Sequence, residues 1–228
     1  MSEPATEAMT RENMRRYAVD RESDFSLLGK EWTVLPGVYP SGSFSSTEFF
    51  ARQDIYPKPG GTFLEIGCGA GVIAVTAATS GCGAVTATDI NPEAVRNTEI
   101  NAHRHGVAGK VSVRHGDLFD PLEADAEFDA VFWNSNGVEM PGDYRHRSTY
   151  ERAFFDPGYK SHRHYIEHGL RHVSAGGRLF LGFSGHGNAA LLHDFAERAG
   201  VTLVERARSG GATRVYRHPH LLLELVRA

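Results

Sequence analysis

The stretch Phe63-Leu-Glu-Ile-Gly-Cys-Gly-Ala-Gly71 decides the fold, because a short apolar run turns there into a cluster of glycines. The run Thr62–Ile66 is typical of a buried strand, and the segment Val72–Ser80 that follows has a helical pattern. Glycine has no Cβ, so the chain can turn sharply between them and a ligand can approach the main chain closely. The stretch therefore predicts a strand, a glycine loop and a helix, with a ligand at the loop.

From Gly61 onward the chain alternates short apolar runs with helical segments. We expect seven strands, at residues 62–66, 84–88, 111–114, 128–133, 178–183, 201–207 and 221–226. Strands separated by helices pair in parallel through right-handed crossovers, whereas the last two have no obvious helix between them and should pair antiparallel. The sequence thus predicts an α/β fold with a seven-stranded, mostly parallel sheet and an antiparallel last strand.

The N-terminal part has a different character from this core. Residues 1–30 are charged with a loose helical pattern, and we expect one or two lid helices or a partly disordered arm there. Residues 32–46 are rich in proline and glycine and should form a loop, and a helix should follow Thr47. We therefore divide the chain into 1–59, an N-terminal lid or arm with an entrance helix, and 60–228, the ligand-binding and catalytic domain.

Composition narrows the class of protein. The chain has 228 residues, 41% of them hydrophobic, with a formal net charge of -4, so a nucleic-acid partner is not expected. The longest apolar runs are far shorter than a membrane span, and the N-terminus lacks the apolar core of a secretory signal. The two cysteines, Cys68 and Cys82, lie inside the core pattern, which favours a reducing compartment. A cytoplasmic enzyme without a membrane partner is the expectation.

The spacing of the glycine loop argues against a dehydrogenase. A dinucleotide fingerprint has the spacing G-x-G-x-x-G, but here the glycines run G-x-G-x-G and Val72 occupies the place of the third Rossmann glycine. Glu65 stands two residues before the first glycine. A carboxylate there suits a cationic amino group better than a pyrophosphate.

Two further carboxylates follow the next two strands. Asp89 ends the second strand, where a carboxylate can accept both hydroxyls of a ribose. Asp117 follows the third strand and can accept from an adenine amino group, while Leu118 or Phe119 packs on the ring. Asp117 can alternatively be a turn-forming residue after Gly116. Carboxyl ends of strands at a topological switch point face ligands, so together these positions predict a nucleoside-shaped site.

These motifs resemble the class I S-adenosylmethionine-dependent methyltransferases over roughly residues 60–228. FLEIGCGAG is similar to the first motif of that family. TDINPEAVRNTEINAHRHG, from Thr88 to Gly106, resembles the subgroup containing release-factor glutamine methyltransferases and small-subunit ribosomal RNA guanine methyltransferases. YPSGSFSSTE resembles the stretch before the core in the glutamine enzymes, which would place Thr47 and Glu48 near the cofactor entrance.

The resemblance implies a Rossmann-like fold with an N-terminal helical lid and S-adenosyl-L-methionine as the cofactor. It implies that Glu65 and the glycines lie near the amino-acid part of the cofactor, that Asp89 holds the ribose, and that Asp117 with Leu118 frames the adenine. The cofactor-binding candidates are Glu65, Gly67, Cys68, Gly69, Gly71, Asp89, Ile90, Asp117, Leu118 and Asn134.

The strand Phe128–Asn134 ends in an asparagine that many enzymes of the subgroup continue as Asn-Pro-Pro-Tyr. Here Ser135, Asn136 and Gly137 follow instead, so the stacking ring and the rigid prolines are gone. A release-factor or nucleobase-amine substrate is therefore not expected. Asn134 can still align an acceptor NH or OH, or it can simply close the loop after the strand.

The segment from Asp143 to His164 is rich in Arg, His and Tyr, and such an insertion commonly covers the substrate in this fold. Its Asp156-Pro-Gly-Tyr159 turn can aim Asp156 or Tyr159 into the site. His186 follows the fifth strand between glycines and is a candidate base or a plain loop residue. The catalytic candidates are Asn134, Tyr159 and His186.

The spacing His162-x-His164-x-x-x-His168 invites a metal site, but no carboxylate or cysteine cluster joins it, so no metal is expected. We expect an S-adenosylmethionine-dependent N- or O-methyltransferase acting on a small molecule, with specialised metabolite biosynthesis as one role. One alternative is an enzyme that cyclises S-adenosylmethionine to azetidine-2-carboxylate and releases methylthioadenosine. A second alternative is a non-catalytic cofactor-binding domain.

Overall fold

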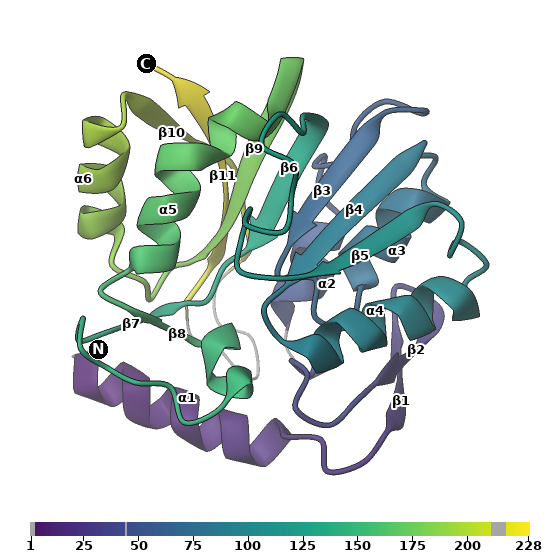
Figure 1. The fold of residues 1–228 in the computed structure, drawn as a ribbon. Coiled ribbons are helices and arrows are strands. Elements are labelled where there is room, and N and C mark those ends of the chain that lie inside the picture. The colour runs from purple at the N-terminus through teal and green to yellow at the C-terminus, as the bar shows by residue number, and fades with distance from the viewer. Residues whose placement is uncertain (1–2, 44, 211–217) are drawn as a thin grey trace.

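The computed structural model describes residues 3–43, 45–210 and 218–228. A seven-stranded sheet runs through the molecule in the order β10-β11-β9-β6-β3-β4-β5 (Figure 1). Only β11 runs antiparallel to its sheet neighbours, and the other pairs are parallel. These findings confirm the expected α/β fold. The strands are β3 (Thr62–Ile66), β4 (Ala84–Asp89), β5 (Val111–His115), β6 (Phe128–Asn134), β9 (Val173–Ser184), β10 (Val201–Arg208) and β11 (His220–Arg227).

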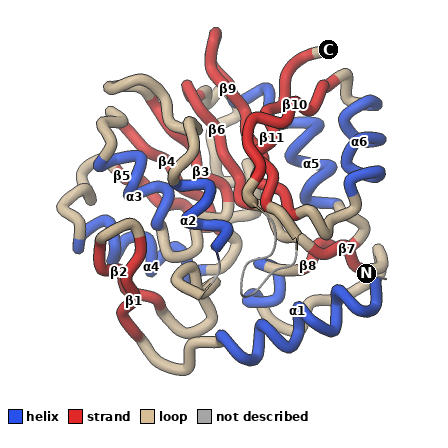
Figure 2. Tube along the Cα trace, turned by 180° about the vertical axis from the view of Figure 1, so that it is seen from behind, coloured by secondary structure: helices blue, strands red, loops and turns tan. Residues whose placement is uncertain are grey.

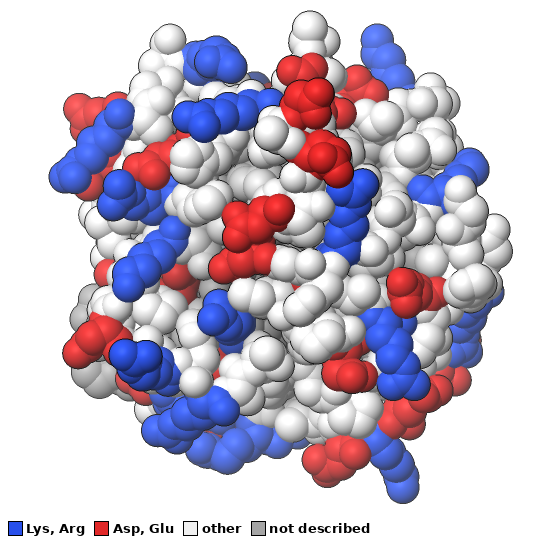
Figure 3. Space-filling view, in the orientation of Figure 1, with Lys and Arg blue, Asp and Glu red and all other residues white. Residues whose placement is uncertain are grey.

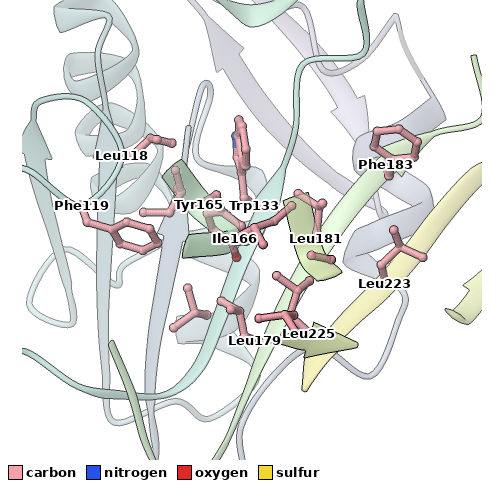
Figure 4. Close-up of a cluster of buried hydrophobic side chains, with 14 of the residues drawn as sticks. Leu118, Phe119, Trp133, Tyr165, Ile166, Leu179, Leu181, Phe183, Leu223 and Leu225 are labelled. Carbon is pink, nitrogen blue, oxygen red and sulfur yellow. The ribbon is translucent and has the colours of Figure 1, made fainter. Parts of the chain in front are cut away.

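Helices cover both faces of this sheet (Figure 2). On one face Leu64 and Ile66 of β3 join a buried cluster with α5 (Lys160–His168) and α6 (Ala189–Arg198). Figure 4 shows part of that cluster, with Trp133 and Tyr165 side by side. On the other face Phe63 packs with α2 (Ser45–Ala51) and α3 (Val72–Thr79). Alternate strand residues thus face opposite layers, as the pleat requires.

The helix after β4 follows its sequence signals closely. Asn91 caps α4 (Pro92–Arg104), because its side chain accepts a hydrogen bond of 3.1 Å from the N–H of Glu93. Proline occupies the first helical position, and Gly106, with φ of 70°, follows the end. The helix therefore begins and ends where capping and glycine chemistry predict.

Residues 3–30 contain one helix, which is one of the two expected numbers. Helix α1 (Glu3–Tyr17) is followed by a hairpin of β1 (Ser23–Leu27) and β2 (Lys30–Val34), where a second lid helix was one expectation. The turn is made by two residues with positive φ, Leu28 at 55° and Gly29 at 71°. Trp32 of β2 is fully buried in a cluster with α3 and α4, so packing rather than local propensity fixes this strand. Whether residues 1–59 act as a lid stays a prediction.

The segment 148–173 is divided by a short strand. The 3-10 helix η1 (Thr149–Ala153) precedes β8 (Phe155–Pro157), which pairs in parallel with β7 (Val138–Met140). Gly158 and Tyr159 then have positive φ values of 62° and 48°, so the chain turns sharply between β8 and α5. The 3-10 helix η2 (Gly169–His172) follows α5. Proline followed by glycine at this point explains why one continuous helix is excluded.

Helix α1 is tied to this segment by Arg11. Its guanidinium donates to Glu151 at 3.0 Å and to the hydroxyl of Tyr144 at 2.9 Å, and it lies 4.7 Å from the centre of the Phe155 ring. Met14 of α1 joins the buried cluster of β7 and β8. Within the described ranges, no helix has both the length and the apolar character needed to cross a membrane.

Candidate functional site

A cavity opens at the carboxyl ends of β3, β4 and β6, where the strand order reverses. One wall comes from the glycine loop, from Asp89 with Ile90, and from Asp117 with Leu118. The opposite wall comes from α1, the loop after β2 and η1, while the loop after β6 lies between the walls. The switch point predicted from strand order is thus where the candidate residues gather.

The glycine loop brings a main-chain cradle to the cavity. Gly67 and Gly69 line it with φ values of 66° and 55°, and no atom lies within 4 Å of a Cβ placed on Gly69. Cys68 lines the cavity too. Gly71 is not among the described residues that line the cavity. Its φ is 76°, and a Cβ there would lie 2.8 Å from Thr98 Cγ2, so glycine is needed at this position for close packing. The loop therefore leaves open space for a ligand at Gly69 and none at Gly71.

Glu65 lies beneath this loop and is almost fully buried. Its Oε2 accepts a hydrogen bond of 2.8 Å from the N–H of Ala74 in α3. Burial raises the pKa of the Glu65 carboxyl well above its usual range, and the nearby Asp89 carboxylate raises it further. A cationic group entering the cavity would reverse that effect, because it would compensate the buried negative charge.

Asp89 joins the ends of two strands. Its Oδ2 accepts from the N–H of Gly69 at 2.9 Å and its Oδ1 accepts from the N–H of Asn91 at 2.8 Å. Burial raises the pKa of Asp89 to about 6, although both main-chain hydrogen bonds favour the ionised form. Each carboxylate oxygen can accept more than one hydrogen bond, so both retain capacity for the hydroxyls of a ligand.

Leu118 is held in a strained conformation at the edge of the cavity. Its φ is 44°, a region that non-glycine residues rarely adopt, and its carbonyl accepts a hydrogen bond of 2.9 Å from the Thr88 hydroxyl. Asp117 is exposed and lines the same part of the cavity. Phe119 instead packs into the core, with its ring stacked 5.5 Å from Tyr165 and 4.7 Å from His172. Of the two predicted ring-packing residues, the structure brings Leu118 to the cavity.

Asn134 ends β6 and lines the cavity half-buried. Its side-chain amide makes no hydrogen bond to any residue within 3–43, 45–210 or 218–228. Trp133, one residue earlier, is buried and also lines the cavity, and its Nε1 would lie 3.3 Å from a Cβ on Gly67. The indole therefore supports the glycine loop, while the Asn134 amide remains available to a ligand.

The other two catalytic candidates lie in different surroundings. His186 lines the cavity and bonds Ser184 Oγ through Nδ1 at 2.6 Å. Burial, with the neighbouring His218 and His220, lowers the pKa of His186 to about 4, so its ring is neutral at neutral pH. Tyr159 is fully buried outside the cavity lining, where its hydroxyl donates to the Gly137 carbonyl at 3.3 Å and accepts from a main-chain N–H at 3.0 Å.

The structure joins three residues that the sequence left apart. His162 Nδ1 lies 2.7 Å from Asp156 Oδ2, and His162 Nε2 lies 2.9 Å from Ser135 Oγ. His162 and Asp156 are fully buried, whereas Ser135 is half-buried and lines the cavity beside Asn134. The spacing of His162, His164 and His168 drew attention to this helix, but nothing in the sequence pairs it with Ser135.

Among the residues that the structure describes, no group of three or more His, Cys, Asp or Glu side chains is arranged to hold a metal ion. The ring of His162 is directed to Ser135 and Asp156, and the rings of His164 and His168 meet edge to face with centres 4.5 Å apart. The three histidines of the motif therefore do not converge on one point.

Known proteins share both sequence and fold with this chain. Residues 63–154 match a methyltransferase domain family. A ribosomal protein L11 methyltransferase of Pelotomaculum thermopropionicum is 45% identical over 94 residues, which span 40% of this chain and 30% of that protein. A ribosomal protein L11 methylase from Lactobacillus delbrueckii subsp. bulgaricus superposes with a TM-score of 0.58 and 16% identity, covering 85% of this chain and 83% of that one. A 16S rRNA N2 methyltransferase from T. thermophilus, in complex with AdoMet and guanosine, gives a TM-score of 0.61 and 18% identity over 90% of this chain and 50% of that one.

These similarities confirm the resemblance to class I S-adenosylmethionine-dependent methyltransferases, and with it the expected enzyme class and the cofactor of that class. They correct the expected small-molecule acceptor and the expected absence of a nucleic-acid partner. The relatives are methyltransferases of a ribosomal protein and of a ribosomal RNA. The missing Pro-Pro-Tyr was a poor guide, because it shapes contacts to one acceptor group and says little about the size of the molecule carrying that group. The alternatives of cofactor cyclisation and of a non-catalytic domain have no counterpart in these relatives.

Proposed function

We propose that this chain, whose core is a class I S-adenosylmethionine-dependent methyltransferase domain, methylates a nitrogen atom of a macromolecule. When bound, S-adenosylmethionine supplies an electrophilic methyl group on a sulfonium sulfur. The observation that carries the nitrogen acceptor is the unpaired amide of Asn134, which lies on the cavity between the wall of carboxylates and the wall of α1 and η1. The similarity to methyltransferases of a ribosomal protein and of a ribosomal RNA supports a macromolecule as the carrier of that nitrogen. An amide oxygen there can align an acceptor N–H without donating a competing proton.

The residues of the first wall fit the cofactor group by group. Gly69 leaves space for close approach to the main chain, and Asp89 has free acceptor capacity for two ribose hydroxyls. Leu118 offers an apolar surface beside the exposed carboxylate of Asp117, which suits an adenine ring and its amino group. The buried Glu65 carboxylate favours a cationic amino group above it. Cys68 and Ile90 line the cavity between these points and complete the proposed cofactor site.

Catalysis in this site depends mainly on positioning. The cavity walls hold the two reactants together, and Asn134 at the cavity fixes the direction from which the acceptor nitrogen approaches. The neutral His186 ring is a second group that can orient the acceptor, since it bonds Ser184 and lies close to Gly137 in the same wall.

A protein is the first candidate acceptor. One sequence relative is a ribosomal protein L11 methyltransferase, which is 45% identical to this chain over 94 residues. A ribosomal substrate would place the enzyme in the cytoplasm, as the cysteine usage also suggests.

RNA is the second candidate, and one surface feature favours it. Between Arg145 and Arg171 six cationic side chains are exposed: Arg145, Arg147, Arg152, Lys160, Arg163 and Arg171. Figure 3 shows Lys and Arg gathered on the left and lower parts of this face, over the region of α1, α5 and the loop after β7. Arg152 also lines the cavity, so phosphate groups bound there would lie beside the acceptor position.

The proposal is tested with S-adenosylmethionine that carries a tritiated methyl group. The full chain is incubated separately with ribosomal proteins, ribosomal RNA and transfer RNA, and each fraction is counted after precipitation. We expect label in one macromolecular fraction, lost in Asn134→Ala. Label in none of the three fractions, with S-adenosylhomocysteine bound normally, would overturn a macromolecular acceptor.

A further inference from the structure

We propose that Ser135, His162 and Asp156 form a proton relay that removes the proton from the acceptor nitrogen. The inference rests on the proposed nitrogen methylation. It concerns the same cavity but a different set of side chains from those assigned to the cofactor.

The three side chains form one continuous hydrogen-bonded line from the cavity into the core. Ser135 Oγ is at the cavity wall, one residue after Asn134, and lies 2.9 Å from His162 Nε2. The opposite ring nitrogen, Nδ1, lies 2.7 Å from Asp156 Oδ2. His162 is fully buried and does not line the cavity, so a proton from an acceptor reaches the ring through the Ser135 hydroxyl.

The fixed parts of this line orient the ring. The Asp156 carboxylate accepts hydrogen bonds of 3.1 Å from the main-chain N–H groups of Ser161 and His162 at the beginning of α5. The imidazole is stacked 4.2 Å from the Tyr159 ring and tilted against Trp133 at 4.9 Å. Tyr159 and Asp156 are the titratable side chains in these contacts. This packing leaves the ring little freedom, as a relay requires.

The Gly182 carbonyl is a second hydrogen-bond acceptor for Ser135, so the same geometry fits both the neutral and the protonated His162 ring. Ser135 Oγ also lies 2.8 Å from the carbonyl oxygen of Gly182. Before proton uptake, Ser135 donates its hydroxyl proton to Nε2, and Nδ1–H donates to Asp156. After uptake, Nε2–H donates to Ser135 Oγ, and the serine hydroxyl donates to Gly182 instead. No heavy atom has to move between the two states.

The proton balance is complete within the named groups. As the N–H bond of the acceptor breaks, its proton binds Ser135 Oγ, and the original hydroxyl proton passes to His162 Nε2. The ring becomes an imidazolium that is paired with the Asp156 carboxylate, which remains ionised. The acceptor nitrogen retains the electron pair of the broken N–H bond. The imidazolium returns its proton to solvent by the reverse path after the product leaves.

Two variants interrupt the relay and leave the main-chain hydrogen bonds around it in place. Ser135→Ala keeps the main-chain hydrogen bond of 3.0 Å from Ser135 N–H to Gly182, and His162→Gln keeps a polar side chain of similar length. We expect each to lower kcat about a hundredfold, in the range of general base catalysis, with KM and the Kd of S-adenosylhomocysteine changed less than twofold. The double variant should be no slower than the slower single variant, because both remove one pathway.

Proton NMR provides a readout that does not depend on the acceptor. The Nδ1–H of His162, bonded to the buried Asp156, should give a low-field imidazole resonance in the wild type. That resonance should disappear in His162→Gln and move in Ser135→Ala, because Nε2 loses its partner. If no acceptor is labelled, the proposed function fails and the relay is judged by this resonance alone.

Matched controls are available on the outer elements. Ser112 is exposed on β5 and His193 is exposed on α6, so Ser112→Ala and His193→Gln should leave kcat and the low-field resonance unchanged. A Ser135→Ala enzyme with more than half of wild-type kcat would overturn the relay, as would additive losses in the double variant. Covalent labelling of Ser135 by a fluorophosphonate would also overturn it, because the serine would then be a nucleophile.

Discussion

Asp89 accepts a hydrogen bond of 2.9 Å from the main-chain N–H of Gly69, and this contact joins the ends of β4 and β3 beneath the cavity. A single carboxylate thus fixes the glycine loop and retains lone pairs for a ligand. The same carboxylate is half-buried, so its ionisation, the loop position and ligand binding are linked.

Replacement of Asp89 by Asn should weaken cofactor binding strongly. The loss of charge-assisted hydrogen bonds costs about 1.5–3 kcal/mol, which corresponds to a roughly ten- to hundredfold higher Kd for S-adenosylhomocysteine. Titration calorimetry measures this directly, with the exposed Asp120→Asn as the control. An unchanged Kd in a folded Asp89→Asn protein would remove Asp89 from the cofactor site.

The pH dependence of cofactor binding should identify the same group. Because the pKa of Asp89 is raised to about 6, the free protein protonates this carboxyl as the pH falls below about 6. Ribose hydroxyls bind the ionised form better, so the affinity for S-adenosylhomocysteine should decrease from pH 7 to pH 5. Asp89→Asn should make this part of the profile flat. An equal decrease in the variant would assign the titration to another group, such as Glu65 or Asp117.

His186 should make the free energy of unfolding decrease in acid. Its folded pKa of about 4 lies below the ordinary value of 6.5, so only the unfolded chain binds a proton between these values. The free energy of unfolding should therefore decrease as the pH falls from about 6.5 to about 4. Urea unfolding of His186→Gln should show a shallower decrease than the wild type over this window. Identical slopes would mean that other buried groups, such as His220, dominate the acid response.

Asn134→Ala should separate turnover from cofactor binding. Its amide lies beyond the carboxylates of the first wall, and loss of an aligning hydrogen bond near the reacting atoms can reduce kcat on the order of a hundredfold. The Kd of S-adenosylhomocysteine should change little. Wild-type turnover in this variant would assign Asn134 to loop closure.

Two glycine substitutions should have different consequences. Gly69 and Gly71 both have positive φ, which costs an alanine about 1–2 kcal/mol. Only Gly71→Ala also places a Cβ 2.8 Å from Thr98 Cγ2. The overpacking adds about 1–3 kcal/mol, so Gly71→Ala should unfold at a lower urea concentration than Gly69→Ala. Gly69→Ala should instead reduce cofactor affinity. The reverse order of stabilities would contradict the assigned roles.

The sequence predicted what local chemistry determines. Asn91 and Pro92 begin α4 through chemistry that acts within a few residues, and the parallel pairing of the strands followed from their separation by helices. The β1–β2 hairpin was missed because the burial of Trp32 depends on α3 and α4, which lie far along the chain.

The sequence also predicted only part of the candidate site. Cavity residues at the ends of β3, β4 and β6 could be placed from topology alone. The link between Ser135 and His162 spans 27 positions and depends on the turn at Gly158 and Tyr159, which no periodic pattern specifies. The size of the acceptor could not be inferred from Asn134, because the sequence shows the group at the reaction centre and not the molecule attached to it.

The ion pair between Arg11 and Glu151 indicates that acceptor specificity and cofactor binding can be engineered separately. It joins α1 to η1, so part of the wall opposite the carboxylates is built from elements that lie outside β3, β4 and the glycine loop. Substitutions in that wall should change which molecule is methylated while the donor is held as before. Chimeras that exchange α1 together with residues 138–157, and leave residues 60–118 intact, are therefore the reasonable starting point for redirecting this enzyme to new acceptors.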